Sequence, residues 1–386
     1  MRRTHRTRAL LAAAGTLAVT AGVLVGASPA STAGPTISVH TYLSGLNAPR
    51  GLAFDRRGRL YVAQSGVAGS GDHGLTHSGR VQRYDRPSTT PVWSTTFASL
   101  FAHEAPPPAP ADALGPEGIS ALVRGCGPRG HVRPVNCQPR MITSESNLGT
   151  GTTNRDVGRL FRLNRHNGKA TTLSNVGDQQ WRFTKRHPNV AEPNPDSNPF
   201  GVLVTRIDGR TRTFVADAGA NTISEIRRNG RTRVIALIPN DTPKHDSTPT
   251  CVTQGPDGML YVATLDLVVN GFGANPGHSK VWRVDPDANY PTRPTVWATG
   301  LTTVTACTFD RTGHFWGAEM FAPNSSGPPG DLVRIGFQHP QHLQHLGLGE
   351  IPLPGGLALG PGRALYVSTN SAAPGPAGQV VRVTMN

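Results

Sequence analysis

Short apolar runs separated by tight turns recur along this chain, and the first pair lies in PRGLAFDRRGRLYVAQSG at residues 49–66. The runs GLAF and LYVA flank DRRGR, where Gly58 supplies the positive φ that a short turn requires. This pattern predicts a β-hairpin. Similar pairs return five more times, and the six copies begin PRGLAF, PEGISA, PFGVLV, PTCVTQ, VTACTF and PGGLAL, near residues 49, 116, 199, 249, 304 and 354.

Each copy continues with further strands. A second apolar strand follows five of the six starts, as in RLYVA and MLYVA, and in the second copy we expect it beyond a cysteine loop, at PRMITSE. A third strand has its own pattern, from GRVQRYD at Gly79 to GQVVRVT at Gly378, and a fourth often follows. Four short strands in a unit of ~50 residues are typical of a β-propeller blade.

The two ends of the repeated region predict how the ring closes. The last copy stops after its third strand, and an additional apolar strand, TISVHTYLSG, precedes the first copy at residues 36–45. If that strand completes blade six, no sheet edge is left open. The sequence therefore predicts an all-β fold, a six-bladed β-propeller whose N-terminal strand closes the last blade. A β-sandwich or two unrelated β domains would not explain six copies in phase.

The first 33 residues differ in composition from the rest. A basic head, MRRTHRTR, is followed by an apolar run of small residues and then by SPASTA, which is the order of a secretory signal peptide. A retained anchor helix is the alternative, and Pro29 and the small-residue site disfavour it. We expect cleavage after Ala33, which leaves a secreted single propeller domain at residues 34–386. No later run reaches the ~20 apolar residues of a membrane span.

The chain is basic, with a formal net charge of +14, which raises the question of an acidic partner. Lysine is rare, however, and arginine is scattered without a block of five or more. Arginine also recurs at the same point of several repeats, which favours solvated strand faces over a nucleic-acid surface. We therefore expect no nucleic acid as a partner. We also expect no membrane span, and a monomer that binds a small molecule or an extracellular partner.

Four cysteines in an exported chain suggest two disulfides. Cys126 and Cys137 lie in the Gly/Pro-rich stretch GCGPRGHVRPVNC, where they can close a short loop. In the repeat alignment, Cys251 and Cys307 occupy positions along the first strand of the repeat that differ by one residue. Because adjacent blades face each other with opposite sides, such positions can meet, so we expect a Cys251–Cys307 bond between blades four and five. Two buried free thiols are the alternative.

Candidate binding residues follow from the fold, because the loop before strand one and the loop after strand two lie around the same mouth of a propeller's central channel. Residues before strand one are Arg50, Glu117, Asn198 and Asp246, and residues after strand two are Gln64, Asp217, Asn221, Asp266, Glu319 and Asn370. Carboxylates and amides converging on one mouth could hold Ca²⁺, which takes six to eight oxygen ligands. They could equally bind a polar ligand through hydrogen bonds, or serve only as turn residues.

A second pattern places three histidines three residues apart, in HPQHLQH at residues 339–345. Such spacing could suggest a metal site. Pro340 and the position of the segment between blades five and six favour a surface loop instead.

Several stretches resemble the ScyD/ScyE family, a group of exported proteins in the NHL/SMP-30-like propeller superfamily. They are DSNPFGVLV, VADAGANTISEI, PTCVTQGPDGMLYVATL, ATGLTTVTACTFDRTGHFWGAEM and PGGLALGPGRALYVSTN. The resemblance spans nearly the whole mature chain and departs in blade two, where the cysteine loop replaces a regular hairpin. It implies the fold and export, and it supplies no catalytic residues because the family has none that are well established.

More distant resemblances give the alternatives. Calcium-dependent lactonases have a Glu and an Asn before two of their blades, as Glu117 and Asn198 are here, but their following Asp-Gly is replaced by Thr250-Cys251. Our main expectation is a secreted propeller of unassigned activity that binds a ligand at the channel mouth. The alternative is a metal-dependent hydrolase that holds its ion with Glu117, Asn198, Asp217 and Glu319 and uses a bound water as nucleophile. A quinone-dependent dehydrogenase ranks third, because no His–Arg constellation for it is evident.

Overall fold

A computed structural model describes most of the chain beyond the predicted leader. The described residues are 35–67, 69, 74–85, 88–102, 112–123, 125–126, 130, 132–145, 156–188, 195–240, 246–289, 292–325, 328–373 and 375–386. The leader and its cleavage site lie outside them. Residues Pro35–Asn386 form one compact unit, in which no described helix is both long and apolar enough to cross a bilayer.

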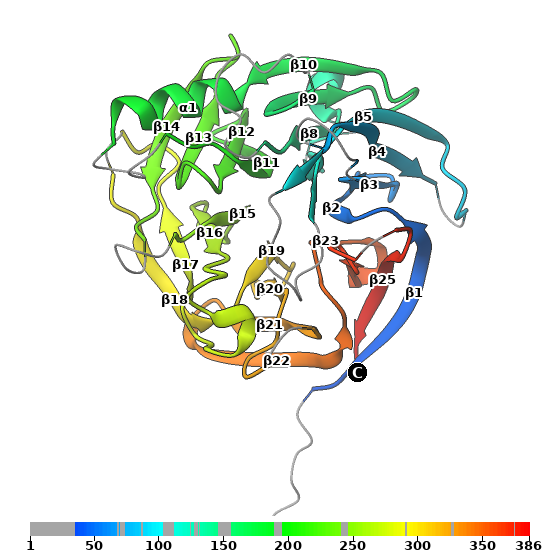
Figure 1. Ribbon diagram of the computed structural model, residues 1–386, viewed down its shortest axis with the longest axis vertical. Coiled ribbons are helices and arrows are strands. Elements are labelled where there is room, and N and C mark those ends of the chain that lie inside the picture. The colour runs from blue at the N-terminus through cyan, green and yellow to red at the C-terminus, as the bar shows by residue number, and fades with distance from the viewer. Residues whose placement is uncertain are drawn as a thin grey trace, which may run out of the picture. The chain divides into compact units, whose positions relative to one another are not determined.

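Six antiparallel sheets surround a common centre in this unit, which confirms the predicted six-bladed β-propeller (Figure 1). The innermost strands are β2 (Pro49–Phe54), β7 (Pro116–Ser120), β11 (Pro199–Ile207), β15 (Pro249–Gln254), β19 (Val304–Phe309) and β23 (Gly356–Leu359). The second strands are β3 (Leu60–Gln64), β8 (Arg140–Thr143), β12 (Arg210–Asp217), β16 (Leu260–Thr264), β20 (Phe315–Glu319) and β24 (Leu365–Thr369). The strand expected at PRMITSE is β8.

The outer half of each blade follows the same order. Third strands are β4 (Thr76–Tyr84), β9 (Arg159–Leu163), β13 (Thr222–Ile226), β17 (Ser279–Val284), β21 (Gly330–Gly336) and β25 (Gly378–Met385). Fourth strands are β5 (Trp93–Ala102), β10 (Ala170–Asn175), β14 (Thr232–Leu237), β18 (Thr295–Leu301), β22 (His339–Ile351) and β1 (Ile37–Leu46). β1 pairs with β25 from Ile37↔Met385 to Leu46↔Gly378, so the N-terminal strand closes blade six as expected.

Three features depart from the sequence-based expectation. Helix α1 (Val176–Arg186) follows β10, and its N-cap residue Asn175 accepts a hydrogen bond from the backbone N–H of Asp178 at 3.2 Å. A short strand, β6 (Asp112–Leu114), adds a fifth strand to blade one. The expectation of a surface loop at residues 339–345 is wrong, because this segment begins β22, the outermost strand of blade five.

Apolar residues pack between neighbouring blades. The cluster between blades one and six contains Leu52, Phe54, Leu60 and Val62 from the first hairpin, together with Tyr366 from β24. The innermost strands approach each other closely because their third residue is small. A Cβ added to Gly201 would lie 2.6 Å from the carbonyl oxygen of Thr250 in the next blade. The close approach therefore explains the glycine that four of the six blades have at this position, whereas blades four and five have Cys251 and Ala306 there.

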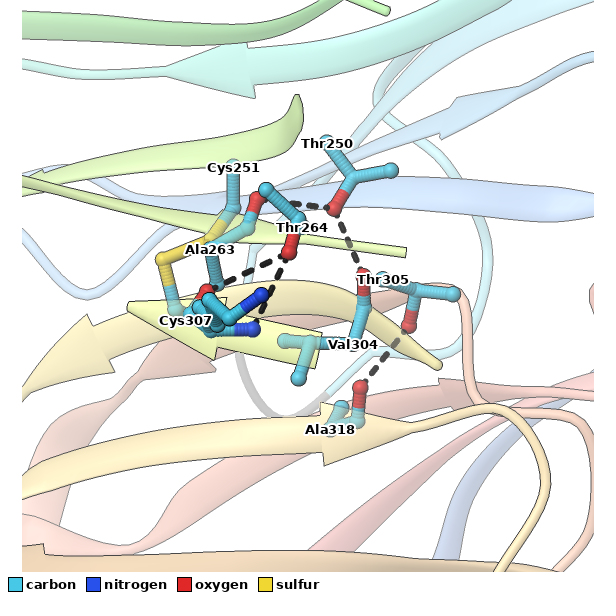
Figure 2. Close-up of a disulfide and its surroundings, with 9 residues drawn as sticks. Thr250, Cys251, Ala263, Thr264, Val304, Thr305, Cys307 and Ala318 are labelled. Carbon is cyan, nitrogen blue, oxygen red and sulfur yellow. Dashed lines mark hydrogen bonds between the residues drawn. A yellow bond between two sulfur atoms is a disulfide. The ribbon is translucent and has the colours of Figure 1, made fainter. Parts of the chain in front are cut away.

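Both expected disulfides are present, with Cα atoms 5.8 Å apart in each. Cys126–Cys137 closes the loop of blade two, which contains a 3₁₀ turn at Pro134–Cys137. Cys251–Cys307 joins β15 to β19, and Figure 2 shows it lying between the two innermost strands. Beside it, the Thr250 hydroxyl donates to the carbonyl oxygen of Val304 at 2.6 Å, a second link between blades four and five (Figure 2).

Candidate functional site

Buried carboxylates gather at one end of the propeller. The mouth end is defined here as the end at which first strands begin, second strands end and third strands begin. All six buried carboxylates of the described residues lie there and are at most 2% exposed: Glu117, Glu145, Asp217, Asp266, Glu319 and Asp331. Of the buried arginines, Arg50 alone lies at this end, whereas Arg59 and Arg83 lie near the opposite ends of their strands beside Asp55 and Asp85.

Arg50 and Glu117 form a buried ion pair across the first and second blades. Nε of Arg50 lies 3.6 Å from Oε2 of Glu117, and neither side chain is more than 3% exposed. The Ser65 hydroxyl donates to Oε1 of Glu117 at 2.8 Å. Two predicted candidates are thus in contact, and a guanidinium already stands beside the carboxylate that a lactonase-like metal would require.

Three predicted candidates share one structural task. The side chain at the end of strand two accepts a hydrogen bond from a backbone N–H in the loop that leads into strand one. This arrangement fixes the loop in three different blades, so it belongs to the repeat. The pairs are Gln64 with Asn47 at 2.9 Å, Asp217 with Asn198 at 2.7 Å and Glu319 with Thr302 at 2.6 Å.

Asp217 and Glu145 form a buried acidic pair between blades three and two. Both oxygens of Asp217 accept hydrogen bonds, yet burial raises its pKa to about 6. Glu145 has no hydrogen-bond partner for Oε1 and is enclosed by the backbone of Gly158 and Gly177. Burial, and then the negative charge of Asp217, raises the pKa of Glu145 to about 8. Neighbouring Ser144 donates a hydrogen bond to Oδ1 of Asn198.

The remaining candidates occupy turns after strand two. Asn221, Asp266 and Asn370 have φ values of 50°, 45° and 53°, in the left-handed region that Asn and Asp tolerate best among non-glycine residues. Asn221 donates to Asp246, so the structure brings these two predicted candidates together. Asp266 accepts from the Thr264 hydroxyl, and Asn370 donates to the carbonyl oxygen of Ala377 at 3.1 Å.

A cluster in blade five joins one predicted candidate to two residues that were not proposed as its partners. Nδ1 of His345 lies 2.8 Å from Oδ2 of Asp331 and 3.4 Å from Oε2 of Glu319. The neighbouring carboxylates of Asp331 and Glu319 raise the pKa of His345, while burial raises the pKa of Glu319. Asp331 begins the third strand opposite the end of the second, so the repeat alignment held a signal for it, whereas His345 was assigned to a loop.

The four predicted metal ligands are engaged by different partners. Glu117 contacts Arg50, and Asn198 accepts from Ser144. Both oxygens of Asp217 are hydrogen bonded, and Glu319 accepts from the backbone N–H of Thr302. Within the described ranges, the one group of three His, Cys, Asp or Glu donors lying within 4.8 Å of one another is Glu319, Asp331 and His345. The residues present therefore do not fit a shared calcium ion of the predicted composition.

The central channel itself is narrow. Its cavity measures about 80 Å³ and is lined by the innermost strands, with Phe200, Leu52 and the Cys251–Cys307 disulfide in its wall. Pockets for small molecules commonly measure about 300–1,000 Å³. A ligand larger than a few waters would have to bind at an end of this channel.

No protein-family model and no curated protein matches the chain. Similar solved structures include the PQQ-bound aldose sugar dehydrogenase of Streptomyces coelicolor, at 14% identity over 91% of this chain and 99% of that one, with a TM-score of 0.54. Others are a putative glucose dehydrogenase of Thermus thermophilus (15%, 90% and 100%, 0.53) and a gluconolactonase of Xanthomonas campestris (11%, 91% and 95%, 0.51). At such identities the likeness shows the fold alone, and this chain has the β-propeller fold of these enzymes.

Proposed function

We propose that this chain is an exported propeller of the ScyD/ScyE type that binds a positively charged ligand at its mouth end. The observation that carries the proposal is the presence there of six buried carboxylates and one buried arginine. A buried carboxylate is costly unless it is paired, and a nearby opposite charge favours its ionised form. A cation that binds at this end gains the attraction of groups already removed from water, whereas a neutral ligand does not.

Export is part of the proposal. Two disulfides are consistent with an extracellular protein, because such bonds persist in oxidising compartments. The predicted signal peptide lies outside the described residues, so export rests on its sequence pattern and on these two bonds.

Binding is favoured over the two enzymatic alternatives. The hydrolase hypothesis requires one ion shared by Glu117, Asn198, Asp217 and Glu319, which are engaged by separate partners. The dehydrogenase hypothesis requires a quinone cofactor at an end of the channel, because the channel cavity of about 80 Å³ is too small for one. The sequence shows no His–Arg constellation that would hold the cofactor there.

A thermal-unfolding screen tests the proposed function. The protein, produced from the full sequence and stripped with chelator, is heated at about pH 8 with Ca²⁺, Mn²⁺, Zn²⁺, spermidine or choline, each against NaCl of equal ionic strength. A ligand at 100 times its Kd adds about 2.7 kcal/mol to the stability of the folded state. We expect at least one of these cations to raise the unfolding midpoint by several degrees. A midpoint that no cation raises above its NaCl control would overturn the proposal.

A further inference from the structure

We infer that Glu319, Asp331 and His345 form a binding site for a first-row divalent metal ion of the zinc type. The inference gives the positively charged ligand a chemical class and a place, so it rests on the proposed function. It differs from the calcium site predicted from the sequence, because it uses three neighbouring strands of one blade and a histidine that the prediction left out.

The strand register of blade five brings the three donors together. Glu319 at the end of β20 pairs directly with Asp331 at the start of β21. His345 on β22 pairs with Val333, which lies two residues beyond Asp331 and therefore on the same face of the strand. The ligand atoms of all three residues lie within 4.8 Å of one another. Local pairing in the sheet, rather than a flexible loop, positions the site.

Two oxygens of the cluster are buried without a hydrogen-bond partner. These are Oε2 of Glu319 and Oδ1 of Asp331, and both side chains are fully buried. A buried carboxylate oxygen without a partner is costly. A divalent ion bound beside a neutral imidazole would balance the two carboxylate charges and give both oxygens a partner. A protonated imidazole, which carries one positive charge, balances only one of the two carboxylate charges.

The donor set selects the class of metal. One imidazole nitrogen and two carboxylate oxygens suit Zn²⁺ and its first-row neighbours, whereas Ca²⁺ takes six to eight oxygen ligands. Donors around a tetrahedral zinc lie about 3.3 Å apart, given bonds of about 2.0 Å. The separations of 2.8 and 3.4 Å from His345 are close to that value, so small shifts would admit the ion. His345 is one-third exposed, which provides access from solvent and room for a further ligand.

Calorimetric titration with Zn²⁺ tests the inference on the full-length, disulfide-bonded protein after chelator treatment. Wild type is compared with His345→Ala and with His342→Ala, a matched control on the same strand whose side chain is exposed and stacks on His339. We expect one Zn²⁺ per chain in wild type, at least a ~100-fold weaker Kd in His345→Ala, and a Kd within threefold of wild type in His342→Ala.

A second variant keeps the test valid if His345→Ala does not fold. Glu319→Gln keeps the shape of the side chain and the oxygen that accepts from Thr302, but removes the charge. It should also weaken Zn²⁺ binding, and it should remove the visible absorption of the Co²⁺-loaded wild type. Absence of Zn²⁺ heat in wild type, or equal binding in all variants, would make the cluster a structural ion triad and overturn the inference. A response to Ca²⁺, spermidine or choline in the thermal screen would then leave the proposed function standing.

Discussion

Glu145→Gln is the substitution whose effect follows most directly from the charge at the mouth end. Glu145 is 1% exposed, and its pKa is raised from 4.5 to about 8 by burial and by the negative charge of Asp217, Asp178 and Asp196, against the opposing charge of Arg159. At 1.36 kcal/mol for each pKa unit, this difference corresponds to an upper limit of about 5 kcal/mol.

The sign of the effect follows from where the proton is held. The folded state keeps the Glu145 proton to a higher pH than the unfolded state, so this group lowers stability progressively as pH rises from about 4.5 to about 8. Glutamine cannot ionise, so Glu145→Gln removes the pH-dependent loss of stability. We expect the variant to match wild type near pH 4.5 and to be more stable by up to about 5 kcal/mol at pH 8.

Urea unfolding at several values between pH 5 and 8 measures this difference on chelator-treated, disulfide-bonded protein. Glu350→Gln is the control, because Glu350 is an exposed carboxylate on β22 and its replacement leaves the buried acids unchanged. If the advantage of Glu145→Gln did not grow with pH, or if the variant were less stable than wild type at pH 8, the reasoning about the buried acids would be refuted.

Three further substitutions test the ring. Replacing Cys251 and Cys307 by alanine removes a bond that spans 56 residues and should lower the free energy of unfolding by about 4 kcal/mol, measured by urea unfolding. Arg50→Met leaves Glu117 without its guanidinium and should cost about 3–5 kcal/mol at pH 7, while adding Glu117→Gln should restore part of it in a double-mutant cycle. Gly201→Ala places a Cβ against the neighbouring blade and should cost about 1–3 kcal/mol, seen as a lower thermal midpoint.

The fold was predictable because the repeat records it. Each hairpin contributes the same apolar positions to the space between blades. Residues equivalent to Leu52 and Val62 therefore recur around the ring. The same phase placed Cys251 and Cys307 on facing strands, and the bond between them is confirmed. The unfinished last copy and the additional first strand gave the closure of blade six.

Outer elements were harder to predict, because less of their surface is buried. β22 has a mixed pattern of exposed and half-buried positions, so its sequence lacks a clear apolar alternation and Pro340 suggested a loop. Helix α1 replaces no strand of the repeat, and nothing in the phase of the six copies required it. The cluster around His345 was therefore missed, since it depends on the pairing of β21 with β22.

The candidate residues at the mouth could be placed at one end of the ring, but their partners could not be predicted. Whether Glu117 faces a ligand or Arg50 depends on the contact between two blades, which no single repeat encodes. Likewise, Asp217 accepts a hydrogen bond from the backbone N–H of Asn198, which belongs to a loop whose path is set by the tertiary structure.

Anomalous diffraction from crystals grown with Zn²⁺, recorded on both sides of the zinc absorption edge, shows where the mouth end of the propeller binds a cation. We expect a zinc peak at the mouth end, bonded to Glu319, Asp331 and His345 of blade five. Crystals in which zinc occupies only exposed histidines such as His342, with the blade-five cluster and the other buried carboxylates of the mouth end free of any cation, would contradict this expectation.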